Sequence, residues 1–212
     1  MFQALRIRDF RLMWVGGLIS SLGSWLLVIA IPAHVLLATG SVRDTGLTLA
    51  AEYLPLLVLG PVAGVCADRW DRRRVMIAAN LVSASAAGTM LLGTSPGRYW
   101  VLYLALIAES GGSVLYTPAA QARTPAIVGT GTLLSSANSL NAGTDGVVRL
   151  VGGPLGGILL TACGIDRLIG ADALSYLAAG GLVFLTSRPP GRREDPRATA
   201  GDVARDLVAG LA

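Results

Sequence analysis

The sequence predicts an all-α membrane protein in which six transmembrane helices form one bundle. The first observation is composition, since 53% of the 212 residues are apolar and the mean hydropathy is +0.62. The second is charge: only 14% of the residues are charged, against roughly 25% in soluble proteins. The third is spacing, because the apolar runs between the charged clusters reach the roughly 20 residues that a helix needs to cross a bilayer.

Six apolar segments qualify as spans. The first follows three arginines, as a signal peptide would, but it exceeds the roughly 7–15 apolar residues of a cleavable signal and therefore predicts a retained helix. The fifth is longer than one span requires, and tilting would absorb the excess. The predicted spans are 12–37, 47–67, 75–93, 99–116, 133–162 and 168–187, with connections that include 39–46, 94–98, 117–132 and 164–167.

Arginine placement predicts the orientation. All seventeen basic residues are arginines, and thirteen fall in the two terminal segments or in the connections after spans two and four. Three lie in the other connections, and Arg149 lies within a span. Because basic residues concentrate on the cytoplasmic side, we expect a multi-pass protein of the cell membrane with both termini cytoplasmic. The same placement argues for a bilayer as the partner and against nucleic acid.

Two domains are expected. Residues 1–187 would form a six-helix transmembrane half, and residues 188–212 a hydrophilic cytoplasmic linker. Within the linker, Val203, Leu207 and Leu211 fall on one helical face, which predicts the start of an amphipathic helix on the inner membrane surface. This pattern has no stop signal, which predicts a chain that continues further.

A short pattern occurs twice. Gly60-Pro61 and Gly64 lie in the second predicted span, and Gly153-Pro154 and Gly157 lie in the fifth. The second and fifth spans are equivalent members of two three-helix units, so the pattern supports a 3+3 inverted repeat of the kind found in transporters. Small residues let helices approach closely in lipid, and we expect a packing role for Gly152, Gly153, Pro154, Gly156 and Gly157.

The bend between the second and third predicted spans is densely charged. It holds Asp68, Arg69, Asp71 and residues 72–74, all arginine, in seven positions. Charges of this density mark a membrane surface, because bilayer hydrocarbon cannot solvate them. The stretch is at least a topology anchor, and a second interpretation is a gating latch.

The stretch from Gly64 onward reads G-x-x-x-D-R-x-D-R-R, which resembles the signature of the major facilitator superfamily in its bacterial efflux branch of siderophore and drug exporters. Asp71 occupies the family's usual glycine position. The resemblance implies half of a twelve-span transporter, with a second six-helix half as partner, that exports a small molecule by alternating access and exchanges it for protons. Residues 152–157 resemble the family's antiporter motif, with the proline displaced by one position.

The resemblance also implies the roles within the latch. Asp68 would pair with an arginine and with the N-terminus of a helix of the second half, where a carboxylate is stabilised by the helix dipole. Gly64 would let that helix approach. The charge partners would be Arg69, Arg72 and Arg73.

Five charged residues lie in or near the predicted spans, where charges are costly and are functional candidates for substrate or proton handling. Asp145 and Arg149 are four residues apart and could neutralise each other on one helical face. Glu109 has no charged neighbour in its own span, so it is either a proton carrier or a partner of Arg149. Glu52 is a weaker candidate, and Asp172 could simply cap the sixth helix.

Other functions find little support in the sequence. His34 is the single histidine, and Cys66 and Cys163 are far apart, so we expect no metal site and no cofactor. Catalytic motifs and a phosphate-binding loop are absent from the sequence, which argues against an enzyme. The remaining alternative is a six-span protein that acts only by assembling with another half, as a homodimer or with another chain, or an inactive truncated remnant.

Overall fold

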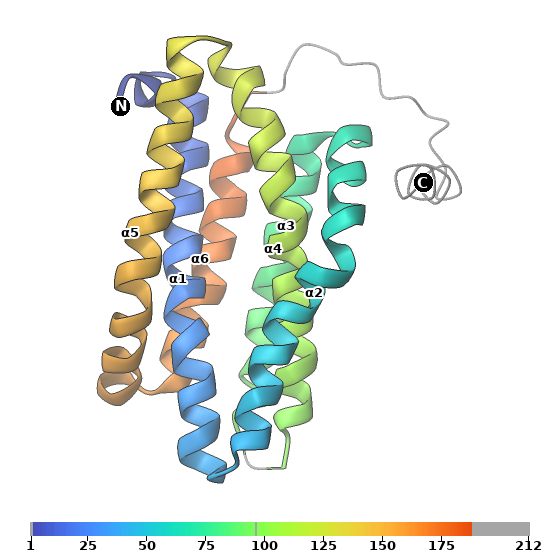
Figure 1. Cartoon of the computed structure of the whole chain (residues 1–212), viewed down its shortest axis with the longest axis vertical. Helices are drawn as coiled ribbons and strands as arrows, with labels where there is room; N and C mark the ends of the chain where they lie inside the picture. The colour runs from blue at the N-terminus through green and yellow to red at the C-terminus, as the bar shows by residue number, and fades with distance from the viewer. Residues whose placement is uncertain (1, 96, 188–212) are drawn as a thin grey trace.

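The structure, a computed structural model, describes residues 2–95 and 97–187, apart from the side chains of residues 62 and 65–69. This part of the chain contains a short 3-10 helix, Phe2–Arg6, followed by six long α-helices and no strand (Figure 1). The helices are α1 (Arg8–Thr39), α2 (Val42–Arg69), α3 (Arg72–Met90), α4 (Tyr99–Val128), α5 (Thr132–Cys163) and α6 (Ile165–Phe184). The expected all-α class is confirmed, and the proposed linker at 188–212 lies outside the described residues.

The helices run side by side along the long axis of the molecule. The N-terminus, the α2–α3 connection, the α4–α5 connection and the end of α6 share one end of the bundle, the upper end in Figure 1. The other three connections lie at the opposite end. Within the described residues, the segments that the arginine pattern assigns to one side of a membrane therefore share one end of the bundle.

Four of the described helices, α1, α4, α5 and α6, are long and apolar enough to cross a membrane. The helices extend beyond several predicted spans, and the connections shrink accordingly. Gly40 and Ser41 alone join α1 to α2, and Gly164 alone joins α5 to α6. Both glycines have positive φ, +67° and +81°, which favours glycine where the chain must reverse within one or two residues.

The expected connection over residues 117–132 is wrong. Helix α4 continues to Val128 through Pro118 and Pro125. A threonine precedes each proline, and its hydroxyl donates to the carbonyl four residues earlier, from Thr117 to Ser113 at 3.1 Å and from Thr124 to Ala120 at 2.9 Å. Each bond lies in the turn where a proline removes one backbone donor.

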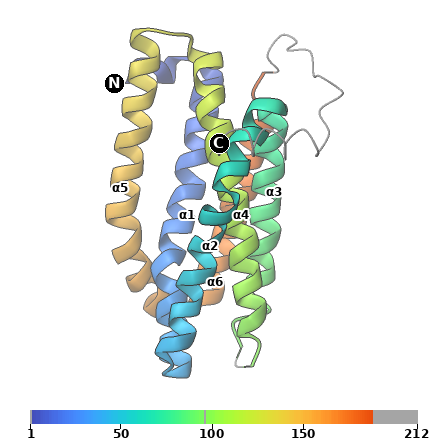
Figure 2. The same cartoon turned by 45° about the vertical axis from the view of Figure 1, so that its right-hand side comes forward.

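Two helices organise the packing. Helix α1 packs against α5 and α6, α4 packs against α2 and α3, and α3 meets α6 between them. Figure 2 shows α5 at the edge of the bundle beside α1. The α1–α5 approach depends on glycine: a Cβ at Gly152 would lie 2.6 Å from the Trp25 Cβ, and one at Gly156 would collide with the Leu26 carbonyl. Gly157 has no neighbour within 4 Å among the described residues.

Candidate functional site: a polar cavity and an arginine cluster

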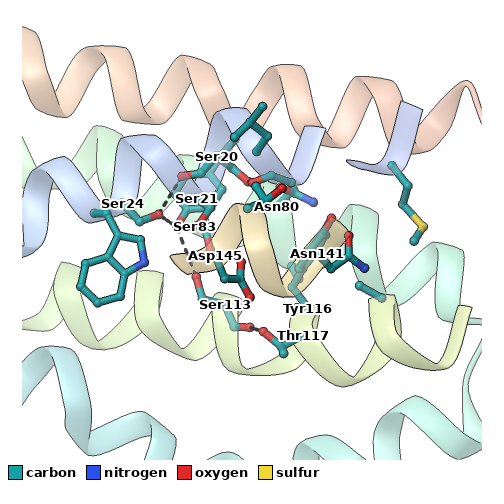
Figure 3. Close-up of a pocket in the computed structure, with 18 of the residues that line it drawn as sticks. Ser20, Ser21, Ser24, Asn80, Ser83, Ser113, Tyr116, Thr117, Asn141 and Asp145 are labelled. Carbon is teal, nitrogen blue, oxygen red and sulfur yellow. Dashed lines mark hydrogen bonds between the residues drawn. The ribbon is translucent and has the colours of Figure 1, made fainter. Parts of the chain in front are cut away.

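A cavity of about 420 Å³ opens between the helices, and all six contribute to its wall. Its lining is rich in hydroxyl and amide groups, although it lies within otherwise apolar helices. Figure 3 shows these side chains converging from several helices, among them Ser20, Ser21, Ser24, Asn80, Ser83, Ser113, Thr117 and Asn141. The cavity can therefore hold a small molecule with polar groups, or water.

Four of the five charged residues that the sequence singles out line this cavity: Glu52, Glu109, Asp145 and Arg149. They come from three helices, α2, α4 and α5, that are separated along the chain. The fifth, Asp172, does not line the cavity but interacts electrostatically with Glu52 and Glu109. Folding thus brings residues 120 positions apart in the sequence to one region of the bundle.

Glu109 is buried in α4 and bound by a tyrosine. The Tyr176 hydroxyl donates to Glu109 Oε1, and the same hydroxyl lies 2.7 Å from Ser24 Oγ and 3.2 Å from Ser113 Oγ. The expected alternative, an ion pair of Glu109 with Arg149, does not form. A hydroxyl, not a cation, solvates this carboxyl group.

The expected Asp145–Arg149 pair is also absent from the described contacts. The Arg149 guanidinium instead lies over the Trp25 ring of α1, 5.1 Å from its centroid. Both charged side chains are exposed at the cavity. Spacing places them on one face of α5, but an aromatic ring on the neighbouring helix offers the cation a second partner.

Asp172 lies two turns inside α6, which begins at Ile165, so it does not cap this helix. It is only 1% exposed and packs beside Gly23 of α1. Ser175 Oγ donates to Asp172 Oδ1 at 3.3 Å, while Oδ2 has no hydrogen-bond partner among the described residues. Asp172 is therefore a buried carboxyl group and not the helix cap that the sequence suggested.

A second polar region lies at the arginine-rich end, and we call Arg72, Arg73 and Arg123 the arginine cluster. Arg72 donates to the Ala122 carbonyl of α4 at 2.8 Å. Arg73 donates to the Phe184 carbonyl and lies 5.1 Å from the centroid of the Phe184 ring.

Arg123 is 3% exposed and donates to Thr186 Oγ1 at 2.8 Å and to the Ser187 carbonyl at 2.9 Å. The Ser187 amide in turn donates to Asp9 Oδ2 of α1 at 3.1 Å. The arginine cluster therefore ties the ends of α3, α4 and α6 together, and Ser187 extends the connection to α1.

The predicted latch is only partly described. Asp71 has a local role, because it is the N-cap of α3 and its Oδ1 accepts from the Arg74 amide at 2.8 Å. The side chains of Asp68 and Arg69 lie outside the described residues. A Cβ at Gly64 would have no neighbour within 4 Å in the described part of the chain.

The sequence reasoning missed Tyr176, Ser24, Ser113, Trp25 and Arg123. It searched the spans for charges and not for hydroxyls. The available signal is the recurrence of serine and threonine every three or four residues within apolar segments, as in Ser20 and Ser24 of α1 or residues 110, 113 and 117 of α4. Such a stripe predicts a polar helix face.

A bundle of long apolar helices around a central cavity, with hydroxyl and carboxyl groups in its wall, is the arrangement expected of a membrane transport protein. The chain belongs to the major facilitator superfamily: residues 1–211 match the family described as transmembrane secretion effectors. The predicted membership in the efflux branch is thereby confirmed.

Individual relatives agree with this assignment. The chain is 29% identical to macrolide efflux protein A of Streptococcus pyogenes over 185 residues, which cover 85% of this chain and 45% of that protein. It is 31% identical to the multidrug efflux pump Tap of Mycolicibacterium fortuitum over 172 residues, 76% of this chain and 42% of the pump. It is 29% identical to the MFS-type transporter YfiS of Bacillus subtilis over 80% of this chain and 40% of that protein. The chain spans about half the length of the curated relatives it matches.

Proposed function

We propose that this chain forms the N-terminal six-helix half of a cell-membrane exporter that moves a small molecule outward by alternating access, in exchange for protons that bind at Glu109. The observation that carries the proposal is the position of Glu109, a buried carboxyl group in the wall of a 420 Å³ cavity that can hold a substrate. A carboxyl group within a membrane bundle is energetically costly, which makes it a candidate for a functional role.

The packing supports the proposed 3+3 inverted repeat of six spans, with α2 and α3 also crossing the membrane. Helix α1 packs on the second and third helices of the other triplet, α5 and α6, and α4 packs in the same way on α2 and α3. Exchanging the two triplets therefore reproduces the pattern of contacts. The common location of the arginine-rich segments supports cytoplasmic termini.

The substrates to try first come from the relatives, which are named as macrolide and multidrug efflux proteins. A second six-helix half would complete the cavity. In the proposed latch, Asp68 would contact a helix of that second half. Gly64 is the place where this helix would approach α2.

The test uses the native gene product in inverted membrane vesicles. An imposed proton gradient is expected to drive uptake of a macrolide or a fluorescent multidrug probe, and Glu109→Gln is expected to reduce the gradient-driven part to background. Asp166→Asn is the control, because Asp166 is exposed in the first turn of α6 and outside the cavity. Unchanged proton-driven uptake in Glu109→Gln would disprove the assignment.

A second candidate follows from the matched length of the relatives: a half-protein that acts only after assembling with a separate half or a second copy. Chemical cross-linking of native membranes followed by mass measurement decides between them. A cross-linked product containing two separate chains supports assembly, whereas one polypeptide of about the relatives' length supports the first proposal.

A further inference from the structure

We propose that Tyr176 and Ser24 form a hydroxyl relay that couples the protonation of Glu109 to hydrogen bonding within α1. Both are positioning residues, since they act through the carboxyl group and not on the substrate. This inference rests on the proposed function, in which Glu109 binds the transported proton.

The relay is an unbroken series of contacts across three helices. Glu109 of α4 contacts the Tyr176 hydroxyl of α6, which lies 2.7 Å from Ser24 Oγ of α1. Ser24 Oγ also lies 3.0 Å from the Ser20 carbonyl, one turn earlier in α1. Ser113 Oγ, at 3.2 Å from the same tyrosine oxygen, is a side branch.

Counting hydrogen atoms shows that this series depends on the proton of Glu109. A hydroxyl donates one hydrogen bond and accepts two, and an ionised carboxylate only accepts. With Glu109 ionised, Tyr176 donates to the carboxylate, and the single hydrogen of Ser24 can serve either Tyr176 at 2.7 Å or the Ser20 carbonyl at 3.0 Å; the relay assigns it to the shorter contact. Ser24 has no second hydrogen, so its bond to the Ser20 carbonyl is lost.

With Glu109 protonated, the direction of donation along the series reverses and each contact contains one hydrogen atom. The carboxylic acid donates to Tyr176, Tyr176 donates to Ser24, and Ser24 donates to the Ser20 carbonyl. Ser113 can donate to the Tyr176 oxygen in both states. When the proton leaves for water in the cavity, which Glu109, Tyr176 and Ser24 all line, α1 loses one hydrogen bond.

Other ionisable groups surround this series. Tyr116 of α4 and Glu52 of α2 share the cavity wall, Asp172 lies beside it on α6, and α5 presents Asp145 and Arg149. The lining residues of α1 and α3 nearest the relay are uncharged: Ser20, Ser24, Asn80 and Ser83. Replacing Tyr176 or Ser24 therefore changes hydrogen bonding and leaves the charges of the site intact.

The test is a pH titration of the purified full chain by infrared difference spectroscopy. The carboxylic-acid band that disappears in Glu109→Gln belongs to Glu109, and its pH midpoint is measured in the variants. Tyr176→Phe removes a donor to the carboxylate, so the midpoint is expected to rise by about one pH unit. Ser24→Ala removes two contacts from the protonated state and one from the ionised state, so its midpoint is expected to fall.

The opposite signs distinguish a relay from simple damage to the cavity, which would shift both variants in one direction. Ser24→Thr keeps the hydroxyl and is expected to keep the midpoint. Tyr99→Phe is the matched control, because the Tyr99 hydroxyl has no partner among the described residues and lies outside the cavity. If Tyr176→Phe does not fold, the Ser24→Ala and Ser24→Thr pair decides alone. Shifts of one sign, or none, would overturn the relay.

This experiment separates the two proposals because it needs no transport. Opposite midpoint shifts together with Glu109-independent export would leave the relay standing and reject the proposed function. Export that depends on Glu109 without opposite shifts would leave the proposed function standing and reject the relay.

Discussion

The arginine cluster and the cavity are both polar regions of an apolar bundle, but their charged side chains have different kinds of hydrogen-bond partner. In the cluster, Arg73 and Arg123 are buried and donate to carbonyl and hydroxyl groups at helix ends. In the cavity wall, one tyrosine hydroxyl, that of Tyr176, is shared by Glu109, Ser24 and Ser113. Arginine always donates and a carbonyl always accepts, so the hydrogen bonds of the cluster have one direction and hold the helices together. Hydroxyl groups can donate or accept, so the hydrogen bonds of the cavity can change direction. The contrast favours a structural role for the first region and supports the proposed protonation changes in the second.

The largest stability effect is expected at Arg123. Arg123→Ala removes two charge-assisted hydrogen bonds, and since each contributes about 1.5–3 kcal/mol, the free energy of unfolding should fall by about 3 kcal/mol. Thermal unfolding of the purified chain measures the loss, with Arg167→Ala as control because Arg167 is exposed. Equal melting temperatures for the two variants would contradict a structural role for the cluster.

The next effect tests the close approach of α1 and α5. Gly152→Ala places a methyl group against the Trp25 Cβ, which cannot move without shifting α1, and overpacking of this kind costs about 1–3 kcal/mol. Gly157→Ala is the matched control on the same helix, since its added methyl group meets no described atom within 4 Å. A lower melting temperature is expected for Gly152→Ala only. Equal destabilisation of both variants would show that the contact with Trp25 is not the cause.

A smaller effect separates capping from latching at Asp71. Asp71→Ala removes the N-cap of α3 and should cost about 1 kcal/mol, whereas Asp71→Asn keeps a capping side chain and should cost little. Thermal unfolding measures both. If Asp71→Asn preserves stability but stops export, the residue also serves the latch; if export continues, the cap is its role.

The smallest effect is expected at Arg149. Arg149→Gln removes the cation above Trp25, and an exposed cation–π contact contributes about 0.5–1 kcal/mol. Arg149→Lys keeps the positive charge and should lose less. A double-mutant cycle with Trp25→Leu measures the coupling, and a coupling energy of zero would show that the stacking has no energetic weight.

The sequence by itself determined the elements of the fold. Apolar runs separated by charged clusters gave six helices, because backbone polar groups in lipid must be satisfied within the helix, and the arginines identified which helix ends lie together. The signature beginning at Gly64 identified the family. The fourth predicted span ends at residue 116, whereas α4 continues through Pro118 and Pro125 to Val128.

Only the tertiary structure decided the partners of the charged side chains. Spacing on α5 paired Asp145 with Arg149, but Trp25 on α1 provides another partner. The position of Asp172 near the start of the sixth span suggested a helix cap, but the structure buries it beside Gly23 of α1. Glu109 found its partner in Tyr176, 67 residues away. Sequence spacing determines which hydrogen bonds and ion pairs can form within one helix. The partners of the other polar side chains depend on which helix packs beside them.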